Sequence, residues 1–173
     1  LLFLLAVCFN LNAQYCIPTV TPIGPALSGC SHVVLNTLNN TSLLKQGYED
    51  FTVLPDTVKL IRGEAYPISI TVGESPQSRI KVWVDWAGDG NFSATNEEVL
   101  SLTNILVGDS IEATITVPVT ATLGYSRMRV AVTRQMNVPD TCNQTSGDIE
   151  DYTIQIVDPF DMEIAGPIST IFK

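Results

Sequence analysis

The chain has 173 residues, a formal net charge of −9 at neutral pH and a single histidine. The negative charge argues against a nucleic-acid partner, because phosphate would repel it, and one imidazole with few cysteines leaves too few ligands for a zinc site. An acidic surface instead suits divalent cations, and extracellular fluid supplies calcium at concentrations that fill modest sites.

Residues 1–13 are typical of a secretory signal peptide. An uncharged apolar run over residues 1–9 is followed by a short polar stretch that ends at Ala13, which predicts cleavage after Ala13 or Gln14. The run is far shorter than the roughly 20 apolar residues that span a bilayer. We therefore expect a mature chain without a membrane span, either secreted or held at the cell surface.

Residues 14–30 form a candidate N-terminal arm, rich in Pro and Gly, with Cys16 and Cys30 near its ends. Two cysteines this close in an oxidising compartment favour a disulfide that pins the arm. The sequence predicts this Cys16–Cys30 bond. Cys142 is then free, paired outside the chain, or the true partner of one of the other two.

Residues 31–158 show the alternation of apolar and polar side chains that is typical of β-strands. No segment keeps a helical period over more than two turns, and Gly, Pro, Asn and Asp separate the alternating runs. The pattern predicts one all-β domain, an antiparallel β-sandwich of the jelly-roll type. The runs that carry this prediction are residues 66–72, 80–86, 111–117, 128–132 and 152–157.

The two tryptophans lie on opposite faces of the predicted strand at residues 80–86. Trp86 falls on the apolar face and is expected in the core. Trp83 shares the other face with Lys81 and Asp85, where packing in a core and stacking on a sugar ring both stay open.

A Gly-rich loop at the end of that strand carries side chains that suit calcium. Asp85 and Asp89 lie four residues apart, in a pattern close to the D-x-N-x-D-G loops that curl their oxygens around the ion. Ala87 stands where such loops carry Asn or Asp, so one oxygen donor is missing. Glu97 or Glu98 would close the site. The alternative is a solvated turn in which Asp and Gly serve backbone geometry alone.

A second acidic segment precedes the last strand, where three carboxylates crowd within residues 147–152. Such crowding is repulsive unless water or a cation neutralises it, and its alternative is an ordinary charged loop. We expect the two acidic segments to share one calcium ion. The candidate ligands are Asp85, Asp89, the backbone carbonyl of Asn91, Glu97, Glu98, Asp148, Glu150 and Asp151.

Residues 82–92 and 147–152, taken together, resemble the GEVED domain family of secreted bacterial proteins, which is found especially in Bacteroidetes. The second segment carries Gly-Asp-Ile-Glu-Asp where the family has the motif that names it. Weaker similarities lie at residues 15–16, 47–52 and 127–130. The departures are Asp148, Ile149 and Ala87, the last of which removes an oxygen donor from the expected metal site.

This resemblance implies a β-sandwich module attached to secreted or surface proteins, without catalytic activity of its own. The lone His32, with no acid near it in sequence, agrees with that, because a Ser/His/Asp assembly needs an oriented imidazole. One hypothesis is a calcium-binding module that mediates adhesion or protein interaction. The alternative is an accessory domain that binds carbohydrate or substrate for a secreted hydrolase, such as a peptidase, whose catalytic part lies outside this chain.

The expected partner under either hypothesis is an extracellular protein or a glycan. Residues 159–173 contain two prolines and are expected to form a linker or the start of a following domain, so that further domains of the same polypeptide would complete the protein.

Overall fold

The computed structural model describes residues 14–23, 29–43, 46–55, 57–73 and 77–160. Within these ranges the chain forms strands and turns, and it contains no helix long and apolar enough to cross a membrane. The predicted signal peptide lies outside the described residues. The strands are β1 (Thr19–Thr21), β2 (Cys30–Leu35), β3 (Leu38–Thr41), β4 (Gly47–Phe51), β5 (Val58–Ile61), β6 (Ala65–Val72), β7 (Gln77–Val84), β8 (Glu98–Leu106), β9 (Ser110–Thr116), β10 (Gly124–Arg134), β11 (Asn143–Thr145) and β12 (Asp148–Val157).

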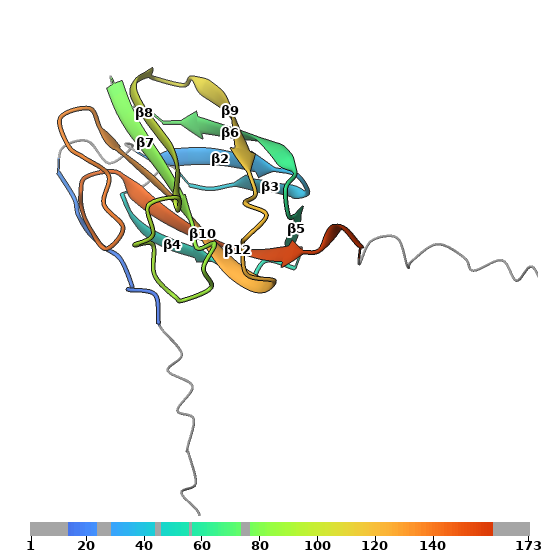
Figure 1. Ribbon diagram of the computed structural model, residues 1–173. Coiled ribbons are helices and arrows are strands. Elements are labelled where there is room, and N and C mark those ends of the chain that lie inside the picture. Colours follow the sequence, from blue (N-terminus) through green and yellow to red (C-terminus); the bar gives the residue numbers. More distant parts are fainter. Residues whose placement is uncertain (1–13, 24–28, 44–45, 56, 74–76, 161–173) are drawn as a thin grey trace, which may run out of the picture.

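Two sheets pack face to face (Figure 1). One has four strands in the order β3-β2-β6-β9, and the other has the order β4-β12-β10-β7-β8 with β5 also paired to β12. β1 and β11 form a short two-stranded sheet of their own. The prediction of an all-β sandwich with mainly antiparallel pairing is confirmed.

The exceptions to antiparallel pairing in the larger sheet are β4 and β5, which both run parallel to β12. In the chain they lie between β3 and β6, which belong to the other sheet. Each therefore reaches the edge of the larger sheet by a crossover between sheets, and a crossover, unlike a tight hairpin, allows a parallel neighbour.

The core between the sheets is built by the alternation that was seen in the sequence. Every second residue of β6, β7 and β12 points inward and is buried, while the residues between them point outward. This spacing matches the period of two along a strand. The inward residues include Ile68, Ile70, Val72, Ile80, Val82, Val84, Tyr152, Ile154 and Ile156.

A smaller apolar cluster covers part of the outer face of the larger sheet. Trp83, Ala131 and Ile149 form it, and Val20 of the arm packs against them together with Tyr48 and Phe92. Trp83 is only 5% exposed and Trp86, in the main core, 3%. Trp86 therefore lies in the core between the sheets, as expected, whereas Trp83 is buried in the smaller cluster on the outer face, where its ring is not open for stacking on a sugar.

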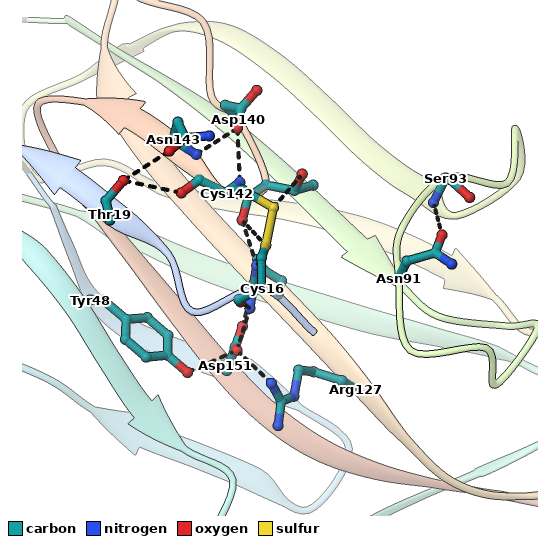
Figure 2. Close-up of a disulfide and its surroundings, with 12 residues drawn as sticks. Cys16, Thr19, Tyr48, Asn91, Ser93, Arg127, Asp140, Cys142, Asn143 and Asp151 are labelled. Carbon is teal, nitrogen blue, oxygen red and sulfur yellow. Dashed lines mark hydrogen bonds and ion pairs between the residues drawn. A yellow bond between two sulfur atoms is a disulfide. The ribbon is translucent and has the colours of Figure 1, made fainter. Parts of the chain in front are cut away.

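The arm is fixed by a disulfide between Cys16 and Cys142, which lie 126 residues apart in the sequence (Figure 2). The predicted Cys16–Cys30 bond is wrong, and Cys30 is a free, buried thiol. The reason is the position of the two residues relative to the larger sheet. Cys16 lies over its outer face, beside Arg129, whereas Cys30 begins β2 of the opposite sheet and packs in the core between them.

Candidate metal centre

Asp85 organises the loop that follows β7. Its Oδ1 accepts hydrogen bonds from the backbone N–H of Gly88 at 2.6 Å and of Asp89 at 3.3 Å, and its Oδ2 accepts one from Gly90 N–H at 2.9 Å. Gly88 and Gly90 have φ of +69° and +79°, a conformation that glycine adopts without steric cost. The buried carboxylate thus curls the loop around itself.

Glu97 closes the loop from its other end. Its two oxygens accept the backbone N–H of Ala87 at 3.2 Å and of Ala94 at 2.9 Å. Burial raises the pKa of the Glu97 carboxyl, and the negative charges of Asp85 and Asp89 add to this effect. The three carboxylates therefore repel one another, which disfavours the ionised form of Glu97 in the loop.

Asp85, Asp89 and Glu97 each place one oxygen within 4.8 Å of the others. The four lone-pair positions of Asp85 are used by the three loop amides and by the Tyr15 hydroxyl, which donates to Oδ2 at 2.6 Å. Asp89 and Glu97 keep acceptor positions for a ligand. These carboxylate oxygens fit a hard cation such as calcium, with water filling the positions that the protein leaves open.

The side chains of Asn91 and Glu98 have structural roles beside this loop. The Asn91 side-chain oxygen accepts the Ser93 N–H at 2.9 Å, a contact seen in Figure 2, while the predicted ligand, the backbone carbonyl of Asn91, stays a prediction. Glu98 begins β8 and points away from the loop to Lys81, whose Nζ lies 2.7 Å from its Oε2. Of these two neighbouring glutamates, Glu97 contacts the loop and Glu98 contacts Lys81.

Asp151 is neutralised by arginine. Arg129 Nε and Nη2 each donate to it at 2.6 Å, Arg127 Nη1 lies 3.2 Å from it and the Tyr48 hydroxyl donates at 3.0 Å. Figure 2 shows Tyr48 and Arg127 on either side of this carboxylate, below the disulfide. Asp151 therefore serves as the centre of a buried ion-pair network on the outer face of the larger sheet.

The predicted sharing of one ion between both acidic segments is wrong. β10 pairs Val132 with Asp148 and Met128 with Val84, the residue before Asp85. At roughly 3.4 Å per residue this separates Asp148 from Asp85 by about 15 Å along the sheet. Asp148 and Glu150 also lie on the opposite face from Asp85, because Asp85 contacts Tyr15 of the arm while Asp148 contacts Cys30 in the core. Asp151 shares the outer face with Asp85, but its carboxylate is held by Arg129.

Asp148 and Glu150 instead form a second acidic cluster with Glu49 of β4, in which one oxygen of each lies within 4.8 Å of the others. Glu49 was missed by the sequence analysis. Its signal is a repeated pattern, since residues 47–51 and 148–152 both place Glu-Asp before an aromatic residue. These two segments lie side by side in parallel register.

Comparison with known proteins bears on the same part of the chain. Residues 79–155 match the profile of the GEVED domain family, which confirms the resemblance found in the sequence. Among solved structures, the PKD domain of an M14-like peptidase from Thermoplasmatales archaeon SCGC AB-540-F20 is similar over 58% of this chain and 86% of that chain, with 10% identity and a TM-score of 0.35. No curated protein matches the chain.

Proposed function

Because residues 79–155 carry a GEVED domain, we propose that the chain is a non-catalytic, calcium-binding β-sandwich module of a secreted or cell-surface protein, where it mediates adhesion or protein interaction. The observation that carries the proposal is the loop after β7, in which Asp85, Asp89 and Glu97 bring oxygens within 4.8 Å of one another. Asp89 and Glu97 hold the ion directly, and Asp85 shapes the loop.

The secreted location is supported by the Cys16–Cys142 disulfide, because such bonds persist in oxidising compartments and are rare in the cytosol. The non-catalytic role is supported by the way in which reactive groups are used. His32, the only imidazole of the chain, bonds to Asn39 at 2.6 Å, and the Asp151 carboxylate is held by Arg129. These groups stabilise the fold.

Thermal melts in calcium and in chelator test the loop site. With calcium at about 100 times its dissociation constant, binding to the folded state should add roughly 2.7 kcal/mol, which for a domain of this size raises Tm by roughly 5–10 °C. Asp89→Asn keeps the side-chain oxygen that caps Asn91 N–H but loses the charge, so the calcium-induced rise should shrink.

Glu98→Gln is the matched control, because it makes the same chemical change beside Glu97 at a residue that contacts Lys81 and not the loop. The rise should be unchanged in Glu98→Gln. An equal rise in Asp89→Asn and Glu98→Gln would show that the loop does not bind the ion.

A second function, binding of a carbohydrate for an associated secreted hydrolase, is favoured by a groove on the outer face. Tyr125 is paired with Gln155 and Gln155 with Lys59, so the three side chains cross β10, β12 and β5 in a row. They line a groove of about 750 Å³, and Tyr125 is 72% exposed. An open ring beside amide and ammonium donors suits the apolar face and hydroxyls of a sugar.

A glycan screen with the parent chain, Tyr125→Ala and Val119→Ala tests this groove. Val119 has the same 72% exposure and does not line the groove, which makes it a control for general loss of apolar surface. Binding should disappear in Tyr125→Ala alone. Glycan binding that survives in Tyr125→Ala would place the ligand elsewhere on the molecule.

A further inference from the structure

β4 lies beside β12 in parallel register, and this brings like charges together on both faces of the larger sheet. Glu49 is the direct neighbour of Glu150, and Asp50 is the direct neighbour of Asp151. Like charges that lie side by side on neighbouring strands are destabilising. Each pair therefore requires a positive partner.

On the outer face, arginine supplies that partner. Arg129 binds both oxygens of Asp151, and Arg127 contacts the same carboxylate. The Thr52 hydroxyl lowers the pKa of Asp50, and the charges of both arginines contribute to this shift. The outer pair is thus compensated by side chains of the fold itself.

On the inner face, a third carboxylate joins the pair, because Asp148 points to the same side of β12 as Glu150. Among the residues that the structure describes, no Lys, Arg or His forms an ion pair with Asp148 or Glu150. Neither side chain is more than 1% exposed. Burial raises the pKa of both carboxyls, and neighbouring negative charges add to the shift.

The hydrogen bonds of the inner cluster leave one buried oxygen unsatisfied. Both oxygens of Asp148 accept the Cys30 N–H, at 2.9 and 3.1 Å, and Glu150 Oε2 accepts the Tyr152 hydroxyl at 2.6 Å. Glu150 Oε1 is buried and accepts no hydrogen bond of good geometry from the described residues, although the Ser42 hydroxyl and the Cys30 thiol lie near the carboxyl. A buried acceptor without a partner is costly, and a bound cation would satisfy it.

We propose that Glu49, Asp148 and Glu150 bind a second divalent cation inside the sandwich, independent of the loop site. All three ligands are carboxylates, the hard donors that calcium and magnesium prefer over softer metals. Calcium suits the cluster better, because magnesium demands a near-octahedral shell with several waters. The ion joins β4 to β12, and Asp148 extends the connection to Cys30 of the opposite sheet.

Calorimetric titration of the full chain with calcium chloride at neutral pH counts the ions. We expect two ions on the parent chain and one on Glu150→Gln, which keeps the shape of the side chain and removes its charge. Glu49→Gln, at a half-buried position of an edge strand, should also bind one. Asp50→Asn makes the matched change on the outer face and should still bind two.

The loop variant Asp89→Asn separates this proposal from the proposed function. A parent chain that binds one ion, lost in Asp89→Asn and retained in Glu150→Gln, overturns the inner site and leaves the loop site standing. One ion that is lost in Glu150→Gln and retained in Asp89→Asn supports the inner site and overturns the loop site. A parent chain that binds no calcium overturns both. Near-ultraviolet circular dichroism checks that each variant is folded. If Glu150→Gln does not fold, the number of ions bound by Glu49→Gln decides the proposal instead.

Discussion

Arg129 holds Asp151 through two hydrogen bonds of 2.6 Å, and neither side chain is exposed to solvent. The same guanidinium donates to the carbonyl oxygens of Cys16, at 3.0 Å, and of Thr141. One cation therefore joins β10, β12, the arm and the segment before β11. Arg129 and Asp151 neutralise each other's charge, so removal of either side chain would leave the other as an unpaired buried charge.

We predict that Arg129→Met destabilises the chain by about 3–5 kcal/mol, the usual cost of removing one partner from a buried ion pair. Urea unfolding measures this loss. Lys81→Met is the matched control, since Lys81 pairs with Glu98 at the surface, where an ion pair is worth less than about 1 kcal/mol. Equal losses in the two variants would contradict the structural role of the Arg129–Asp151 pair.

The Cys16–Cys142 disulfide holds the arm over Trp83, so loss of the disulfide should expose this ring. Cys142→Ser should destabilise the chain by about 2–5 kcal/mol and release the arm from the outer face. Trp83 fluorescence should then shift to longer wavelength and become open to acrylamide quenching, while Trp86 stays in the core. Non-reducing peptide mapping of the parent should recover Cys16 linked to Cys142, and recovery of Cys16 linked to Cys30 would contradict the fold of the arm.

Gly147, the first residue of the GEVED motif, is predicted to tolerate no side chain. Its φ is +76°, and an added Cβ would lie 1.9 Å from the backbone oxygen of Val132. Gly108 has a similar φ of +72° with no atom within 4 Å of the same position. Gly147→Ala should therefore cost more than Gly108→Ala, by roughly 1–3 kcal/mol for the added clash. Equal free energies of unfolding would contradict this close approach.

The inner acidic cluster predicts that, in the presence of a chelator, the free energy of unfolding falls as the pH rises. Burial raises the pKa of Glu150 above its unfolded value, so the folded state binds more protons than the unfolded state. The stability that protonated Glu150 contributes is fully present below the pKa of Glu150 in the unfolded chain, about 4.3. It is lost as the pH rises through the higher pKa of Glu150 in the folded chain. Asp148, Cys30 and Tyr152 face the same space, and burial raises the pKa of each of them as well.

Urea unfolding of the parent and of Glu150→Gln in chelator, between about pH 4.5 and 7.5, measures this effect. The stability of the parent relative to Glu150→Gln should fall as pH rises, and saturating calcium should remove most of that fall. A relative stability that rises with pH would mean that the Glu150 carboxylate is stabilised in its ionised form by the protein alone.

The sheets and the loop could be predicted from the sequence because both depend on local patterns. The alternation along residues 66–72 and 80–86 fixes which side chains face the core. The spacing of Asp85, Gly88 and Asp89 likewise fixes a loop that curls around its first carboxylate. The same period of two along β12 places Asp148 and Glu150 on one face of the strand and Asp151 on the other.

The disulfide and the membership of the inner cluster could not be predicted in this way, because they depend on contacts between distant segments. Cys16 and Cys30 are close in sequence, yet they lie on opposite sides of the larger sheet. Glu49 reaches Glu150 only because β4 crosses between sheets and pairs in parallel with β12. Strand alternation gives no signal for the disulfide or for the pairing of β4 with β12; the repeated Glu-Asp-aromatic pattern at residues 49–51 and 150–152 is the one sequence feature that the two paired strands share.

A crystal structure of the chain grown in calcium chloride, with anomalous diffraction recorded, tests the central claim most directly. We predict an anomalous peak in the loop after β7, with Asp89 and Glu97 oxygens at about 2.3–2.6 Å and the amide bonds of Asp85 retained. A loop that holds only water, at calcium concentrations that saturate modest extracellular sites, would contradict the claim that this module binds calcium through Asp89 and Glu97.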